Sequence, residues 1–189
     1  MVELSIEFEP RQGDWDDLLA CRPGEFLPDL LCGQMTVRLG TAASTIGTLD
    51  PRPYEERGRV PLVLVAVVLF NLLDTGMALL KSRRRVFPFR LADYISLGLE
   101  RKDDKISIRI VKNGGRGNRL GLRKGRIPRP LLSGDVSAVE FARAIVDAST
   151  LIVGRLETER PELVRGDSFW IDIRRKTDDM KSWLVGRIR

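Results

Sequence analysis

The residues best able to do chemistry in this sequence are basic side chains that gather between residues 81 and 129. This segment holds sixteen arginines and lysines against four acids. Only seven of the 32 basic residues in the chain are lysines, and the guanidinium group of arginine is the better bidentate partner for carboxylate and phosphate oxygens. Such a block contacts an anionic partner, balances an acidic part of the same protein, or reflects the base composition of the genome.

A predicted strand and the glycine-rich run after it carry the basic residues of most interest. Alternation places Arg109, Arg119 and Arg123 together on the strand face opposite the isoleucines. The candidate partner-binding residues are therefore Arg109, Arg116, Arg119, Arg123, Lys124 and Arg126. No RNA-binding aromatic pattern and no helix-turn-helix pattern accompanies them, so recognition of nucleic acid would rest on charge alone, and an acidic protein surface is the favoured partner.

The glycine-rich run 113–125 has the composition of a phosphate-binding loop but not its spacing. A dinucleotide-binding fingerprint counted from Gly115 and Gly117 requires a glycine where Leu120 stands. The Gly-Lys-Ser/Thr sequence of a P-loop is also missing. We expect a hairpin turn with a solvated basic face.

Histidine is absent from the sequence, and this absence excludes several reaction types. It rules out Ser/His/Asp and Cys/His nucleophile systems, histidine general bases and zinc sites that use histidine ligands. Cys21 and Cys32 form no CxxC pair and cannot fill a four-ligand zinc site. The acids of residues 14–29 do not match a calcium loop. We expect no catalytic residue, metal or cofactor, and an enzyme with a carboxylate and arginine site is only the third hypothesis.

Asp74 is the most unusual single residue, because it stands in the apolar stretch 60–80. A buried carboxylate without a partner is costly, and Arg90 or Arg143 could serve as its partner. We interpret Asp74 as half of a structural ion pair or as part of a helix end that reaches solvent.

Charge is unevenly distributed along the chain, whose formal net charge is +6. Residues 1–56 hold four basic and eleven acidic side chains, which leaves +13 on residues 57–189.

Residues 1–10 show neither the basic leader nor the apolar core of a signal peptide, so we expect a cytoplasmic protein. In that reducing compartment, we expect no disulfide between Cys21 and Cys32.

The elements that position these residues begin with strands. Strict alternation predicts a strand over residues 2–8 with an acidic outer face, and a second strand over 35–39. A short helix begun by Asp14 is expected between them. Residues 40–58 are small, polar and proline-bearing, and we expect a loop or a mobile excursion there.

Residues 60–80 predict a long apolar helix with Pro61 in its first turn and cations at its end. A span of about 20 apolar residues could cross a bilayer. However, Asp74 would cost roughly 2.5–3.5 kcal/mol at the bilayer centre, and the flanking strands need a cover for their apolar faces. We expect the helix to be buried in a soluble protein with no membrane contact.

Alternation next predicts a hairpin over residues 95–110, and a third strand around Leu120 and Leu122 completes a three-strand meander. Pro128 and Pro130 should end the meander.

An amphipathic helix is predicted over residues 137–159, capped by Ser133 or Asp135. Residues 162–189 fit either two strands, at 169–173 and 183–188, or a helix from Glu162 onward.

These elements predict one α+β domain over residues 1–189, with an antiparallel sheet, a three-strand meander and two long helices packed on one face. The order of the apolar helix 60–80, the meander 94–124 and the helix 137–159 resembles that of small α+β immunity proteins of bacterial polymorphic-toxin systems. The resemblance implies a cytoplasmic protein without catalysis that neutralises a cognate toxin, and it transfers no residue-level site. The toxin surface would then be acidic, or the acidic segment before Arg57 would make the contact.

Our first hypothesis is therefore a protein-binding module, either toxin-neutralising or regulatory. The alternative is a nucleic-acid-binding accessory protein that uses the basic meander 81–129. The sequence leaves the partner's identity and the oligomeric state open.

Overall fold

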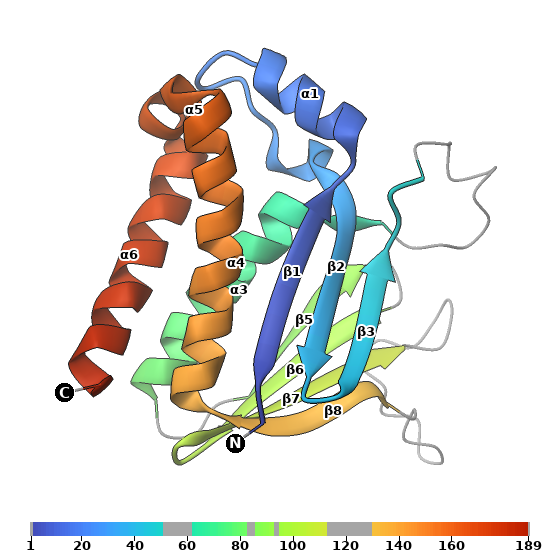
Figure 1. Ribbon diagram of the computed structural model, residues 1–189, viewed down its shortest axis with the longest axis vertical. Helices are drawn as coiled ribbons and strands as arrows, with labels where there is room; N and C mark the ends of the chain where they lie inside the picture. Colours follow the sequence, from blue (N-terminus) through green and yellow to red (C-terminus); the bar gives the residue numbers. More distant parts are fainter. Residues whose placement is uncertain (1, 51–61, 83–85, 93–94, 113–129, 189) are drawn as a thin grey trace.

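Two antiparallel sheets and a group of helices make up the described part of the chain (Figure 1). The structure is a computed structural model and describes residues 2–50, 62–82, 86–92, 95–112 and 130–188. Within these residues, sheet A contains β1 (Leu4–Pro10), β2 (Cys32–Leu39), β3 (Ala42–Gly47) and β4 (Val63–Leu64). Sheet B contains β5 (Val86–Ala92), β6 (Ile95–Lys102), β7 (Lys105–Lys112) and β8 (Pro130–Ser137). The helices are α1 (Gln12–Ala20), the 3-10 turn η1 (Pro28–Leu30), α3 (Val65–Lys81), α4 (Ala138–Glu159), α5 (Pro161–Gly166) and α6 (Ser168–Ile188).

Sheet A confirms the two strands predicted near the amino terminus and adds a third. Leu4 and Ile6 are buried, whereas Glu7 is exposed, as the alternation predicts. The prediction of a loop over residues 40–58 is wrong for β3. That strand buries only Ile46 among small and polar residues, so it lacks the hydrophobic alternation that marks a strand. Residues 51–58 lie outside the described part of the chain.

Sheet B confirms the predicted hairpin as β6 and β7, joined by a tight turn in which Asp103 adopts a positive φ of 56°. The third strand predicted at Leu120 and Leu122 lies outside the described residues. On the side of β7 away from β6, the paired strand is β8. It begins at Pro130, which was expected to end the meander. Pro130 is tolerated because it is the first residue of an edge strand, where its missing N–H removes no ladder bond.

Helix α3 confirms the apolar helix, although it begins at Val65, after the two residues of β4. No helix among the described residues is long and apolar enough to span a membrane.

Helix α4 confirms the amphipathic helix predicted over residues 137–159. Its cap is Ser137, whose Oγ accepts a hydrogen bond from the Glu140 N–H at 3.1 Å. Ser133 and Asp135 lie within β8 instead.

The carboxyl-terminal segment is helical, so the prediction of strands at 169–173 and 183–188 is wrong and the helical alternative is closer. Helix α6 buries residues at alternating spacings of three and four, which is the helical period. These buried residues are Trp170, Ile173, Thr177, Met180 and Leu184. The apparent period of two fails at Ile171, which is exposed.

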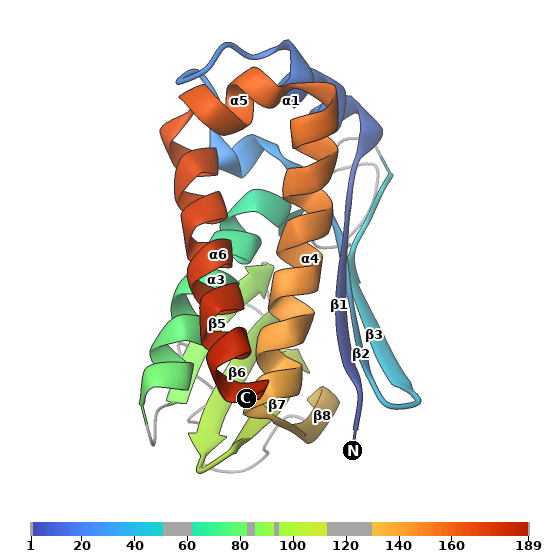
Figure 2. The same cartoon turned by 60° about the vertical axis from the view of Figure 1, so that its left-hand side comes forward.

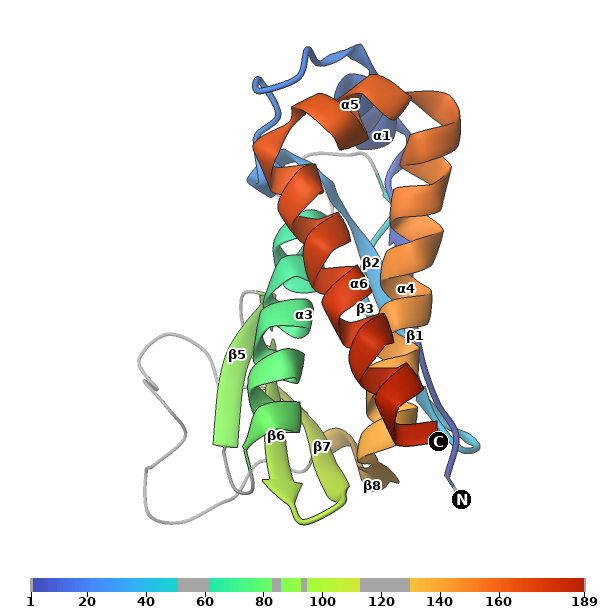
Figure 3. The ribbon, with the colours of Figure 1, turned by 90° about the vertical axis from the view of Figure 1, so that its left-hand side faces the viewer.

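The helices and the two sheets enclose one contiguous core. Figures 2 and 3 show α3, α4 and α6 packed together on one side of the strands. Leu4 of β1, Leu97 of β6, Leu72 of α3 and Phe141 of α4 line a common internal space, so both sheets contribute to it. The α+β class is confirmed. An antiparallel sheet with a three-strand meander, β1–β2–β3, and helices packed against it is also confirmed. The structure adds a second sheet and a third long helix, α6, which the sequence analysis gave only as an alternative.

Candidate functional site

Arg109 is the candidate residue that the structure describes, and it lies where the alternation predicts. On β7, Ile106, Ile108 and Ile110 point into the core, while Arg109 is exposed on the outer face of sheet B. Its cross-strand neighbours are Gly98 of β6 and Ser133 of β8. Because both neighbours are small, they leave the guanidinium group accessible from the solvent side.

The other five candidate residues, Arg116, Arg119, Arg123, Lys124 and Arg126, lie outside the described part of the chain. The structure does fix the two ends of the segment that carries them. Val111 of β7 pairs with Pro130 of β8, so the described residues on either side of this segment lie together at one end of sheet B. By sequence, residues 113–129 contain six basic residues and no acid.

The outer face of sheet B also carries basic residues outside the candidate set. Lys102 and Lys105 form a cross-strand pair beside the β6–β7 turn, and both are exposed. The alternation that places Arg109 outward could have placed Lys105 with it. This end of the face carries both positive and negative side chains. Glu100 lies 3.5 Å from Lys102. The Asp135 carboxylate lies 2.5 Å from the Ser107 hydroxyl.

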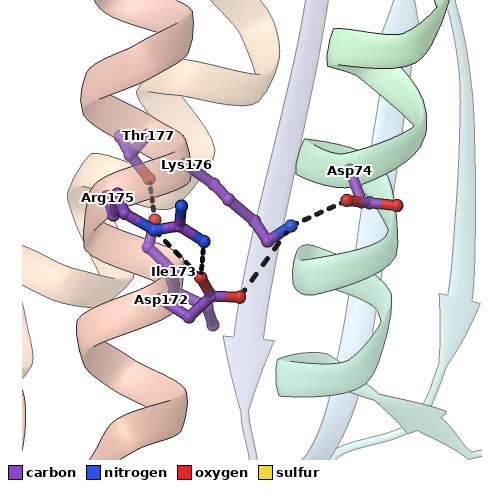
Figure 4. Close-up of polar contacts among 6 residues, drawn as sticks. All are labelled: Asp74, Asp172, Ile173, Arg175, Lys176 and Thr177. Carbon is purple, nitrogen blue, oxygen red and sulfur yellow. Dashed lines mark hydrogen bonds and ion pairs between the residues drawn. The ribbon is translucent and has the colours of Figure 1, made fainter.

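Asp74 forms a structural ion pair, as expected, but neither predicted arginine is its partner. Its Oδ1 lies 2.7 Å from Nζ of Lys176 on α6, and Figure 4 shows this bridge from α3 to α6. Lys176 also lies 3.8 Å from Asp172 and over the ring of Phe70. The Asp74 side chain is 64% exposed, so the helix reaches solvent at this position and the carboxylate escapes the cost of burial. We assign this cluster a role in joining two helices.

Arg143 and Arg90 have other surroundings. Arg143 pairs with Glu140 on its own helix α4. Arg90 is exposed on β5. The alternation over residues 169–173 fits a strand as well as a helix, and only the helix brings Lys176 beside α3.

A second polar contact ties α1 to α4. The Trp15 indole N–H donates to the Glu159 carboxylate at 2.8 Å, and the Arg155 guanidinium lies over the Trp15 ring at 4.1 Å. The Trp15 hydrogen bond, followed by that from Arg155, lowers the pKa of Glu159 below its ordinary value of 4.5. Because Trp15 is fully buried, this arrangement is a packing contact.

The acids and cysteines near the amino terminus make local contacts. Asp14 accepts hydrogen bonds from Arg11 and from the Cys32 N–H. Cys21 and Cys32 are not joined by a disulfide. Among the residues that the structure describes, no group of three or more cysteines and acids is placed to hold a metal ion.

Comparisons with known proteins give no further guide. No family model matches the sequence, and neither curated proteins nor solved structures give a match. We therefore infer function from the exposed face of sheet B and from the basic composition of residues 113–129.

Proposed function

We propose that this protein is a non-catalytic binding protein whose basic surface on sheet B engages the acidic surface of a partner protein. The observation that carries the proposal is the exposed position of Arg109, between small neighbours and on the strand that leads into the arginine-rich segment 113–129. The guanidinium group of arginine can form two parallel hydrogen bonds to a carboxylate. Complementary charge also increases the rate at which two proteins associate. The order of helices and strands adds a resemblance to immunity proteins, so we propose a toxin-neutralising or regulatory role in the cytoplasm.

A protein partner suits the described face better than a nucleic acid does. Glu100 and Asp135 share the outer face with Arg109, Lys102 and Lys105. A uniform polyanion would be repelled by these acids, whereas a protein surface can present both signs. Strands β6, β7 and β8 contain no aromatic residue on which bases could stack. The charge of residues 113–129 favours nucleic acid as the second candidate, because six cations without an acid would suit a phosphate backbone.

Co-purification from the native host tests this proposal. The tagged full-length protein is isolated at near-physiological salt, and bound protein and bound nucleic acid are measured in the same eluate. We expect a stoichiometric protein partner that survives nuclease treatment and has an acidic contact surface. Bound nucleic acid whose affinity falls steeply with salt would contradict the protein-partner proposal in favour of the second candidate.

A further inference from the structure

Strand β3 forms the edge of sheet A on the side away from helix α4. Among the described residues it pairs with β2 alone, and Figures 1 and 2 both show it as the outermost of the long strands on that side. The opposite edge of the sheet, β1, lies alongside α4 and is covered. Ala42, Ala43 and Thr45 are all exposed, so no described element covers the edge of β3.

Strand β8 comes close to β3 but does not lie along its edge. A Cβ on Gly134 of β8 would clash with the side chain of Leu39, which is buried on the inner face of β2. Strand β8 therefore crosses beneath the inner face of sheet A at the β2–β3 hairpin. The two sheets share no hydrogen-bonded pair of described strands, so β8 does not use the outer main-chain groups of β3.

Two residues of β3 direct their main-chain groups away from β2. Directly after β2, the Gly40 N–H donates to the Glu3 carbonyl at 2.9 Å, so even-numbered residues on this strand bond to β1. The odd-numbered residues of β2 therefore bond to β3, and their partners there are even-numbered. The N–H and C=O groups of Ala43 and Thr45 face the open edge, and no described residue forms a hydrogen bond with them there.

The edge of β3 also lacks the features that keep edge strands from pairing. Such strands usually carry a charged side chain, a proline or a bulge. The residues of β3, Ala42–Gly47, include no charge and no proline, and their pairing with β2 shows no register shift. The outer strands of sheet B differ, because β5 contains Pro88 and Arg90 and β8 contains Pro130 and Asp135. An edge without these features is suited to pair with another strand.

Strand β3 is complementary to a second copy of itself. In an antiparallel pair about a twofold axis at Ser44, Ala43 lies opposite Thr45 of the second copy, and the open main-chain groups of both residues bond to each other. Ile46 lies opposite Ala42 of the second copy, so a large side chain meets a small one at each end of the pair. The two Ser44 side chains meet at the axis, where their hydroxyl groups can form a hydrogen bond.

From these features we propose that the protein forms a homodimer in which β3 of one copy pairs with β3 of a second copy about Ser44. The two copies of sheet A then make one continuous sheet. Because this contact uses sheet A, Arg109 and the outer face of sheet B stay accessible in both copies. The dimer therefore presents that face twice, and its formation does not depend on the function proposed for the face.

Salt distinguishes this contact from the one proposed on sheet B. Each copy has a formal net charge of +6, so two copies repel each other at long range, and added salt screens that repulsion. Salt removes no attraction between the paired strands, because β3 has no charged residue. Dimerisation should therefore strengthen as salt is added, whereas binding of an acidic partner to sheet B should weaken.

Sedimentation of the full-length protein over a range of concentrations tests this proposal. We expect a monomer–dimer equilibrium that shifts toward the dimer as salt rises to near-physiological concentration. Ala43→Pro should raise the dimer Kd by at least about tenfold, because it removes an N–H that bonds across the dimer but not to β2. Ala43→Ser is the matched control and should keep the Kd within about twofold. A monomer at every concentration, or a dimer that Ala43→Pro leaves intact, would overturn the proposal.

Cysteine cross-linking tests the alignment and does not require the proline variant to fold. Ser44→Cys should form an intermolecular disulfide under mild oxidation, because side chains directly opposite each other in a non-hydrogen-bonded pair lie close enough for one. Ala42→Cys is the matched control, since it lies on the same face of β3 but opposite Ile46 of the second copy. Wild-type protein, which has Cys21 and Cys32, gives the background. Equal cross-linking of the two variants, or none above background for Ser44→Cys, would refute the proposed pairing.

Discussion

The Arg101 guanidinium on β6 donates to the carbonyl oxygen of Leu79, in the last turn of α3, at 2.9 Å. The same nitrogen also reaches the Leu80 carbonyl, and Nε donates to the Asp103 carbonyl at 2.7 Å. One buried side chain thus donates to two carbonyls at the end of α3 and ties them to the β6–β7 turn; the Leu79 carbonyl also accepts from the Ser82 N–H at 3.3 Å. The cation also complements the negative end of the α3 dipole.

Replacing Arg101 by methionine should therefore destabilise the protein by about 2–3 kcal/mol, because buried carbonyls lose charged donors while the aliphatic stem is kept. Urea denaturation of both proteins measures this difference. Lys102→Met is the control, since its side chain is exposed and its loss should cost about 0.5 kcal/mol or less. Equal midpoints for the two variants would contradict the capping role.

Asp167 caps α6 and holds the amino-terminal segment against it. Its carboxylate accepts from the Phe169 N–H at 3.0 Å and from the Gly24 N–H at 2.9 Å, and the residue is only 2% exposed. Asp167→Ala should cost about 2 kcal/mol, because a helix cap is lost and the Gly24 N–H loses its acceptor. Asp167→Asn keeps an acceptor and should cost less. Thermal or chemical denaturation that ranks the two variants in the opposite order would contradict this account.

Ser149 of α4 and Thr177 of α6 form a buried pair of hydroxyl groups, 2.5 Å apart. The Thr177 hydroxyl also lies 2.8 Å from the Ile173 carbonyl, so it keeps a partner when Ser149 is removed. Thr177→Val leaves the Ser149 hydroxyl buried without that partner and should cost about 1–3 kcal/mol, more than Ser149→Ala. In a double-mutant cycle, the two changes together should cost less than the sum of the single changes. Strict additivity would show that the pair contributes no coupling.

The contact of Glu159 with Trp15 makes stability depend on pH. The pKa of this carboxyl is lowered in the folded protein, so its contribution is present above the ordinary value of 4.5 and is lost as the pH falls through the lowered pKa. The stability advantage of the native protein over Glu159→Gln should therefore shrink between neutral pH and acid. Urea midpoints across this pH range measure the effect. Parallel pH profiles for the two proteins would contradict it.

The elements with a strong hydrophobic period were predictable from the sequence. The alternation of Leu4 with Ile6, and of Ile106 with Ile108, identifies β1 and β7 because one face of each strand is buried. Strand β3 was not predictable, since its exposed alanines and threonine carry no such pattern. In α6, Phe169, Ile171 and Ile173 mimic a strand. The helix is the form that buries Trp170, Ile173 and Thr177 on one face, where Thr177 contacts Ser149 of α4.

The candidate site was predictable only in part. The period of two places Arg109 outward, and the structure confirms this position. The Asp74 partner was not predictable, since Lys176 lies 102 residues away on a helix that the alternation obscured.

The most direct test of the central claim is the affinity of the co-purified protein partner for wild-type protein and for Arg109→Glu. Arg165→Glu is the matched control, because Arg165 is also exposed but lies on α5. The proposed surface predicts that Arg109→Glu weakens binding by about tenfold or more while Arg165→Glu leaves it within about twofold, with unfolding midpoints unchanged in both. Equal affinities for wild-type and Arg109→Glu protein would contradict the account.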